Sequence, residues 1–266
     1  MQSTAHPWLG GGAPVTAAID LASGREAWRL PLAASSLASQ SGISADLRSC
    51  WLAVTNDVVW VVDCAKGTTL WHTEPAPEPA ARFFTSAVAP HALFELRDRR
   101  ATLYDERTGT HRWRVTLPAG TLGWPRGVAP VLDWRNEDVT AIAILDPASG
   151  KTVATIARPP GAGITPDHDG GVLVSGPRLE HYDRGGALVG HAAIANASIV
   201  LGTRYALGIT PAEVIVLAMP ELHELGRIAG RYQDIVVEGA RGAGRAALFA
   251  YDGKVPGRAI LVRLGP

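Results

Sequence analysis

The fold is decided by a stretch near the start of the chain, Ala18-Ile19-Asp20-Leu21-Ala22-Ser23-Gly24-Arg25-Glu26-Ala27-Trp28. In it an apolar strand ends at an Asp, a Gly follows four residues after that Asp, and a Trp follows eight residues after it. The same spacing returns at Asp63, Gly67 and Trp71, and again at Asp105, Gly109 and Trp113. Self-similarity at a fixed period indicates a repeat architecture.

Further copies of the pattern are present but incomplete. The fourth keeps Asp146 and Gly150 and has Ala154 at the Trp position, and the fifth keeps Asp183 with a shorter turn. The sixth, at 216–220, has lost the Asp, and a last apolar strand ends at Gly265, where the Asp would fall. The aligned positions are 20, 63, 105, 146, 183, 218 and 265, with spacings of 43, 42, 41, 37, 35 and 47 residues.

Each copy is preceded by another short apolar strand across a tight turn. These strands are expected at 51–54, 92–96, 171–174, 205–209 and 247–251. A period of about 40 residues with four strands per unit is typical of a β-propeller, because each small sheet buries its faces only against neighbouring sheets. We predict an all-β fold in which residues 1–266 form a single β-propeller domain of four-stranded antiparallel blades. Seven copies favour seven blades; six is the alternative, with the two chain ends sharing a closing blade.

The Asp, Gly and Trp each have a physical role in this pattern. The Asp carboxylate can accept backbone N–H groups of the turn, and the Gly supplies the left-handed conformation that closes it. The Trp is expected to pack between blades. The pattern Asp20-x-x-x-Gly24-x-x-x-Trp28 resembles the tryptophan-docking repeat of PQQ-like (quinoprotein-type) β-propellers. This resemblance implies a propeller fold but not the quinone, because the chain lacks the adjacent cysteine pair of the dehydrogenases. No cofactor is therefore expected, neither PQQ nor a metal ion.

Charge and hydropathy narrow the classes of partner. The 266 residues hold 25 Lys and Arg against 25 Asp and Glu, and no basic run provides the electrostatic footprint of nucleic-acid or anionic-membrane binding. Apolar stretches such as 141–145 are far shorter than a membrane span of about 20 residues. The first residues lack a basic segment followed by an apolar one, so we expect a cytoplasmic protein. The expected partners are a small-molecule ligand or a protein, with no nucleic acid and no membrane.

The two cysteines, Cys50 and Cys64, flank a hairpin that turns at Asn56-Asp57. A two-residue turn would place Cys50 opposite Asp63, and a three-residue turn would place it opposite Cys64, which would permit a disulfide. Because no signal peptide is recognised, we expect both cysteines to be free, buried small side chains.

A ligand site is expected on the channel face, where loops and inner strands of several blades converge. Trp124-Pro125-Arg126 offers an aromatic face beside a guanidinium, and Arg82 and Asp234 belong to similar segments of other blades. This combination suits a partly apolar molecule that carries a carbonyl or carboxylate. The predicted ligand-binding residues are Trp124, Arg126, Arg82 and Asp234.

Evidence for catalysis is weak in this sequence. The chain contains no Gly-x-Ser-x-Gly motif, no phosphate loop and no dinucleotide fingerprint. His168 lies between two aspartates and could be a general base, but Asp and Gly beside it are also typical of a turn, which we favour. His168, Asp234 and Arg126 are the weak catalytic candidates. The sequence therefore favours a binding scaffold; the alternative is a small enzyme, of cyclase or isomerase type, that uses the channel as an apolar pocket.

Overall fold

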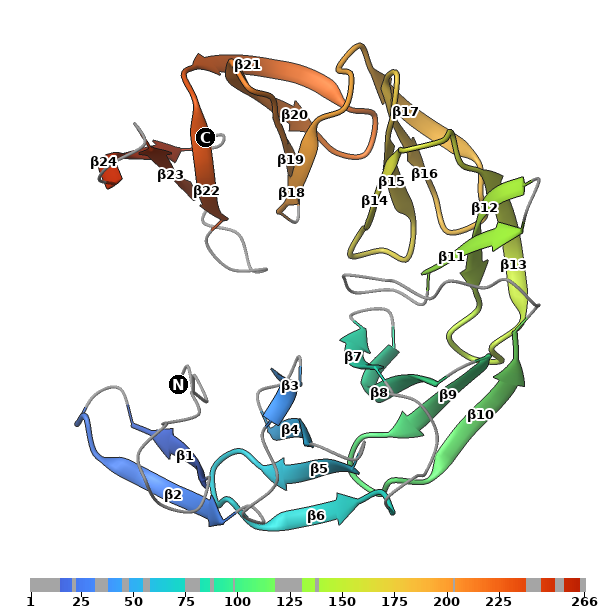
Figure 1. The fold of residues 1–266 in the computed structure, drawn as a ribbon, viewed down its shortest axis with the longest axis vertical. Helices are drawn as coiled ribbons and strands as arrows, with labels where there is room; N and C mark the ends of the chain where they lie inside the picture. The colour runs from blue at the N-terminus through green and yellow to red at the C-terminus, as the bar shows by residue number, and fades with distance from the viewer. Residues whose placement is uncertain are drawn as a thin grey trace. The chain divides into compact units, whose positions relative to one another are not determined.

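The computed structural model describes residues 15–20, 23–31, 38–44, 48–54, 58–74, 82–86, 89–97, 99–117, 131–136, 139–202, 204–237, 245–251 and 256–263. Every regular element within these ranges is a β-strand, and the strands of each sheet follow one another in chain order (Figure 1). No helix in the described part of the chain has the length and hydrophobicity needed to cross a membrane. The chain divides into two compact units.

Unit 1 comprises residues 1–123, 127–130 and 145–151. Its described strands form a two-stranded sheet, β1 (Val15–Ile19) and β2 (Glu26–Pro31), and two four-stranded antiparallel sheets. The first of these contains β3 (Ala38–Ile43), β4 (Ser49–Val54), β5 (Val58–Asp63) and β6 (Thr69–His72). The second contains β7 (Arg82–Ser86), β8 (Ala89–Arg97), β9 (Arg100–Asp105) and β10 (His111–Thr116).

Unit 2 comprises residues 124–126, 131–144 and 152–266 and contains four of the described sheets. The first consists of β11 (Val131–Asn136), β12 (Val139–Leu145) and β13 (Thr152–Ala157). The next two are β14 (Gly163–Pro166), β15 (Val172–Ser175), β16 (Leu179–Tyr182) and β17 (Leu188–Ala192), then β18 (Ser198–Leu201), β19 (Tyr205–Ile209), β20 (Glu213–Ala218) and β21 (His223–Ala229). The last consists of β22 (Tyr232–Val237), β23 (Arg245–Tyr251) and β24 (Pro256–Arg263).

These elements agree with the strand pattern expected from the repeat. The predicted strands at 51–54, 92–96, 171–174, 205–209 and 247–251 correspond to β4, β8, β15, β19 and β23. The described residues form seven sheets, one for each copy of the repeat. The choice between seven and six blades stays a prediction, because it depends on how the two chain ends pair.

The Asp–Gly turn has the predicted geometry. Asp105 Oδ1 accepts the backbone N–H groups of Arg107 and Thr108, each at 3.0 Å, and Asp63 binds its own turn in the same way. Gly109 then adopts a φ of 69°, in the left-handed region that disfavours side chains. The turn between the third and fourth strands is thus held by one carboxylate and one glycine.

Each repeat Trp contacts the corresponding turn of the next copy. The indole Nε1–H groups of Trp28, Trp71 and Trp113 donate to the carbonyls of Cys64, Glu106 and Pro147, at 2.7 to 2.8 Å. Each acceptor is the residue directly after the repeat Asp. The glycine is needed here for a second reason, since a Cβ on Gly109 would lie only 2.7 Å from Trp71 Cδ2. Ala154, which replaces the Trp in the fourth copy, covers Gly186 in the same manner.

One prediction about the cysteines is wrong: Cys50 and Cys64 form a disulfide bond, with their Cα atoms 5.2 Å apart. Neither expected register is present, because Val54 pairs with Val58 and Cys50 lies opposite Val62. Cys64 instead lies in the turn beyond β5, where its N–H donates to the carbonyl of Arg48 and brings it back beside β4. The expected cytoplasmic location stays a prediction.

Reduction of this disulfide should destabilise the protein. The bond joins residues 14 positions apart, and closing a loop of this size lowers the entropy of the unfolded chain enough to contribute about 3 kcal/mol. Chemical denaturation with and without reductant should reveal a loss of this order, and the Cys50→Ser/Cys64→Ser double variant should show it without responding to reductant. Equal stability of all three samples, or two free thiols in the native protein, would exclude the disulfide.

Candidate functional site

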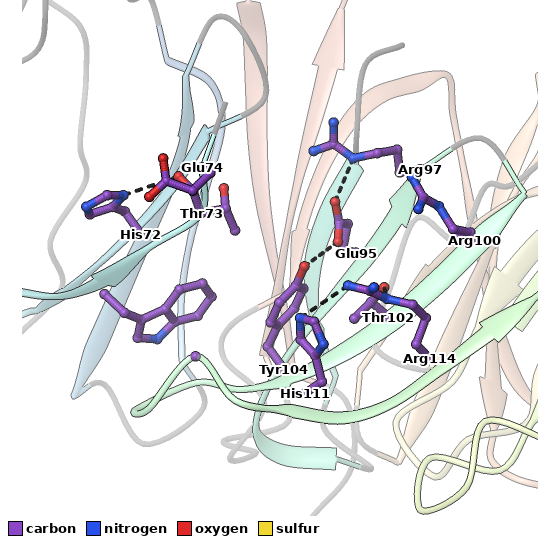
Figure 2. Close-up of a pocket in the computed structure, with 12 residues that line it drawn as sticks. His72, Thr73, Glu74, Glu95, Arg97, Arg100, Thr102, Tyr104, His111 and Arg114 are labelled. Carbon is purple, nitrogen blue, oxygen red and sulfur yellow. Dashed lines mark hydrogen bonds and ion pairs between the residues drawn. The ribbon is translucent and has the colours of Figure 1, made fainter. Parts of the chain in front are cut away.

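A pocket of about 380 Å³ lies in unit 1 between the β3–β6 sheet and the β7–β10 sheet (Figure 2). One wall is the end of β6 and the residues after it, and the other is the face formed by β8, β9 and β10. The volume falls within the range of small-molecule sites, about 300–1,000 Å³. The lining residues are Trp71, His72, Thr73, Glu74, Glu95, Arg97, Arg100, Thr102, Tyr104, Gly109, His111 and Arg114.

The polar wall follows from the alternation of side chains along β9. Successive residues of a strand point to opposite faces, so Arg100, Thr102 and Tyr104 share one face while Ala101 and Leu103 share the other. All three residues of the first face line the pocket. Neighbouring strands extend the face, because Thr102 lies opposite Glu95 on β8 and opposite Arg114 on β10.

The buried part of this polar wall consists of three side chains that are hydrogen-bonded to one another. Glu95 accepts a hydrogen bond from Arg97 Nε at 2.8 Å through one carboxylate oxygen and one from the Tyr104 hydroxyl at 2.5 Å through the other. The side chains of Arg97 and Glu95 are only 7% and 8% exposed. Burial and the hydrogen bond to Glu95 raise the pKa of Tyr104 well above its usual range. Tyr104 therefore stays protonated and holds Glu95 in place.

Arg114 is a guanidinium held in the pocket by neutral partners. Its Nε donates to Thr102 Oγ1 at 3.4 Å, and its Nη2 donates to His111 Nε2 at 3.3 Å. Within the described part of the chain, no carboxylate forms an ion pair with it. Partial burial and the charge of Arg114 lower the pKa of His111, which keeps the imidazole neutral and able to accept this hydrogen bond. The arrangement leaves a positive charge fixed in position beside the cavity.

The opposite wall contributes two rings, Trp71 and His72, to the pocket. Trp71 stacks on Tyr104 with ring centroids 5.5 Å apart, and His72 stacks on Trp60 at 4.7 Å. Glu74 follows on the same side, as Figure 2 shows. Further into the interface the two sheets are joined by an apolar cluster that includes Trp51, Val61, Phe83 and Leu93. The pocket therefore marks the point where this interface changes from apolar to polar.

The charges that line the cavity suit the binding of an anion. Three guanidinium groups and two carboxylates line the cavity, so one positive charge is in excess when the histidines are neutral. The side chains can donate several charge-assisted hydrogen bonds to an anion beside flat aromatic surfaces. Among the residues that the structure describes, no group of three or more His, Cys, Asp or Glu side chains could hold a metal ion.

The residues predicted from the sequence are not those of this pocket. Trp124 and Arg126 lie outside the described residues. Arg82 belongs to β7 and Asp234 to β22, and the described part of the structure does not include their side chains. The channel-face site therefore stays a prediction. A sequence signal for the pocket did exist in the alternation Arg100-x-Thr102-x-Tyr104, which places polar side chains on a strand face next to a repeat Trp.

His168 lies in the turn between β14 and β15, as favoured from the sequence. Its neighbour Asp167 contacts a buried histidine of β16, His181. Asp167 Oδ2 lies 2.6 Å from Nε2 of the buried His181, whose Nδ1 lies 2.7 Å from the carbonyl oxygen of Pro220. Both partners are acceptors, so both ring nitrogens carry protons and His181 is an imidazolium. This buried pair joins the β14–β17 sheet to the turn after β20 in unit 2.

Comparisons with known proteins agree with the repeat and the fold. Residues 9–121 match the family described as outer membrane protein assembly factor BamB, so this part of the chain carries PQQ-like propeller repeats, as the Asp–Gly–Trp spacing predicted. No curated protein matches the chain by sequence.

Three solved structures are similar to the chain over most of its length. BamB from Moraxella catarrhalis is 14% identical with a TM-score of 0.57, covering 94% of this chain and 82% of that one. AztD from Citrobacter koseri is 17% identical with a TM-score of 0.62, covering 95% and 76%. The β-propeller domain of Cps50 from Myceliophteria thermophila is 11% identical with a TM-score of 0.52, covering 82% of each chain. The predicted fold class, an all-β propeller, is confirmed.

Proposed function

We propose that this protein is a propeller scaffold that binds a small molecule, and that the pocket between the β3–β6 and β7–β10 sheets is the binding site. The observation that carries the proposal is the pair of charged side chains, Arg97 and Glu95, buried beside a cavity. Burying charges costs desolvation free energy, whereas apolar residues fill the rest of the same interface. A polar cavity in this place is therefore better explained by a ligand than by packing.

A catalytic role is less well supported by the same residues. The Tyr104 hydroxyl and the Arg97 Nε–H donate to the two oxygens of Glu95, so both carboxylate oxygens are already engaged. Such an arrangement is suited to holding a surface in a fixed shape. The small-enzyme alternative thus has no observation of its own in this pocket.

A thermal-shift screen of small molecules against matched variants tests the proposal. His111 and His223 are both exposed and each is the first residue of the fourth strand of its sheet, but only His111 lines the pocket. A ligand of the native state raises its stability by mass action. Compounds that stabilise the wild type should stabilise His223→Trp equally and lose their effect on His111→Trp, in which the indole fills the cavity.

The screen also separates the pocket from the channel-face site. If every stabilising compound still acts on His111→Trp but fails on Trp124→Ala or Arg126→Ala, the pocket proposal is wrong and the channel face binds. If no compound of any charge class stabilises the wild type, the small-molecule function itself is contradicted. A protein partner would then be the remaining binding role for the scaffold.

A further inference from the structure

We infer that the pocket recognises a planar, singly charged carboxylate, with Arg114 as the group that holds the anion. This inference rests on the proposed function and specifies the chemistry of its ligand. It starts from the position of Arg114, which lines the cavity and donates to the neutral side chains of Thr102 and His111. A guanidinium that is already oriented by neutral partners loses little freedom on binding an anion.

The geometry of the guanidinium favours a carboxylate. The rigid fork of Arg N–H donors matches the two oxygens of a carboxylate and can bind them in parallel. The hydrogen bonds to Thr102 and His111 use the Nε and one Nη atom, and they fix the plane of the fork against β9 and β10. In Figure 2, Arg114 lies beside His111 and Thr102, on the wall opposite His72, Thr73 and Glu74.

The charge of the pocket favours a single negative charge. Glu95 and Glu74 line the same cavity, the first on the wall with Arg114 and the second on the opposite one. Like charges in one pocket repel, so a dianion such as phosphate gains from Arg114 but is opposed by both carboxylates more strongly than a monoanion is. A monoanion matches the one positive charge that is in excess.

The aromatic wall favours a planar ligand body. Trp71 and Tyr104 stack on each other at one side of the cavity, and His72 and His111 add two further flat rings. Tyr104 is also in edge contact with His111, with ring centroids 4.8 Å apart. Offset or edge contacts between rings stabilise aromatic pairs beyond the burial of area alone. An aromatic carboxylate can therefore pack its ring against this group of rings while its anion reaches Arg114.

The test uses benzoate and cinnamate, each paired with its neutral primary amide, together with inorganic phosphate. Binding is measured by calorimetry on the wild type, Arg114→Gln, Arg114→Lys and the control Arg112→Gln. Arg112 lies on the same strand and carries the same charge, but it is paired with Asp105 and does not line the pocket. The carboxylates should bind the wild type and the control, and bind Arg114→Gln about 10- to 100-fold more weakly, the loss expected for charge-assisted hydrogen bonds.

The remaining outcomes are decisive. Arg114→Lys should recover only part of the affinity, because an ammonium group lacks the paired donors. Equal binding of amides and carboxylates, unchanged affinity in Arg114→Gln, or phosphate binding as tightly as the carboxylates would overturn the inference. If amides and carboxylates bind equally and His111→Trp abolishes both, the pocket remains a ligand site and only its preference for a carboxylate is wrong. If neither carboxylate binds the wild type, the aromatic-carboxylate assignment fails, while the broader compound screen decides the pocket separately.

Discussion

Replacing Trp113 with alanine should lower the free energy of unfolding by about 3–5 kcal/mol, the range for removing a large buried aromatic side chain. Trp113 is only 9% exposed, contacts Phe94 edge-on at 5.7 Å and donates its Nε1–H to Pro147. It also covers Gly150, so its removal leaves a cavity that the glycine cannot fill. Chemical denaturation measures this loss directly.

The matched variant Trp113→Phe separates burial from hydrogen bonding. It keeps a ring against the turn but cannot donate to the Pro147 carbonyl, so we expect it to lose about 1 kcal/mol for the missing hydrogen bond, plus the smaller contact area. Trp28→Ala should act in the same direction with a smaller effect, because Trp28 is only partly buried. A loss below about 1 kcal/mol in both alanine variants would contradict a structural role for the repeat Trp.

The second large effect is expected at the buried ion pair of unit 2. Asp167→Asn should destabilise the protein by about 3–5 kcal/mol, because removing one partner leaves the buried His181 without its counter-charge. The control is Asp169→Asn, which changes an exposed carboxylate in the same turn and should alter stability by no more than about 0.5 kcal/mol. Equal stability of the two variants would show that the pair contributes little.

The same pair makes stability depend on pH in a defined direction. Although burial opposes the charged ring, the hydrogen bonds to Asp167 and Pro220 raise the pKa of His181 above its ordinary value of 6.5. The contribution of His181 to stability is therefore complete below the pKa that the histidine has in the unfolded chain. This contribution is lost as pH rises through the raised pKa of the folded protein. The pKa of Asp167 is lowered by His181 and by backbone N–H groups despite burial, so its contribution is lost as pH falls through that lower value.

Urea denaturation across this pH range provides the measurement. The wild type should become less stable as pH rises above neutrality, and His181→Gln should lack this decline because glutamine does not titrate. Asp169 also acts electrostatically on His181. The control variant Asp169→Asn separates the effect of Asp169 from that of Asp167. An identical decline in His181→Gln would assign the pH dependence to other groups.

Much of the fold could be predicted because the repeat is local. Asp105, Gly109 and Trp113 lie within nine residues of one another, and each has a separate reason to be there: accepting backbone N–H groups, adopting positive φ, and covering the next turn. The Asp and the Gly of the turn are therefore kept in the first five copies of the repeat. Where the fourth copy has Ala154, the turn glycine Gly186 is still covered, which explains why the pattern persists after the Trp is lost.

The pocket and the disulfide depend on distances that the sequence does not express. Trp71 and Arg114 line one cavity although they lie on different sheets, and only the packing of those sheets brings them together. The disulfide was missed because the cysteines were expected to be free in a chain without a recognised signal peptide, and because Cys64 reaches Cys50 from the turn beyond β5, where regular pairing with β4 has ended at Asp63. Neither Trp71 and Arg114 nor Cys50 and Cys64 are paired opposite each other in a strand ladder, and such pairing is the only kind of contact that the strand pattern predicts.

The most direct test of the binding function is a crystal structure of the protein grown with cinnamate. We expect electron density for the ligand beside the stacked Trp71–Tyr104 pair, with its carboxylate within hydrogen-bond distance of the Arg114 guanidinium. Ligand density beside Trp124 and Arg126 instead, or a pocket closed by its own side chains, would contradict it.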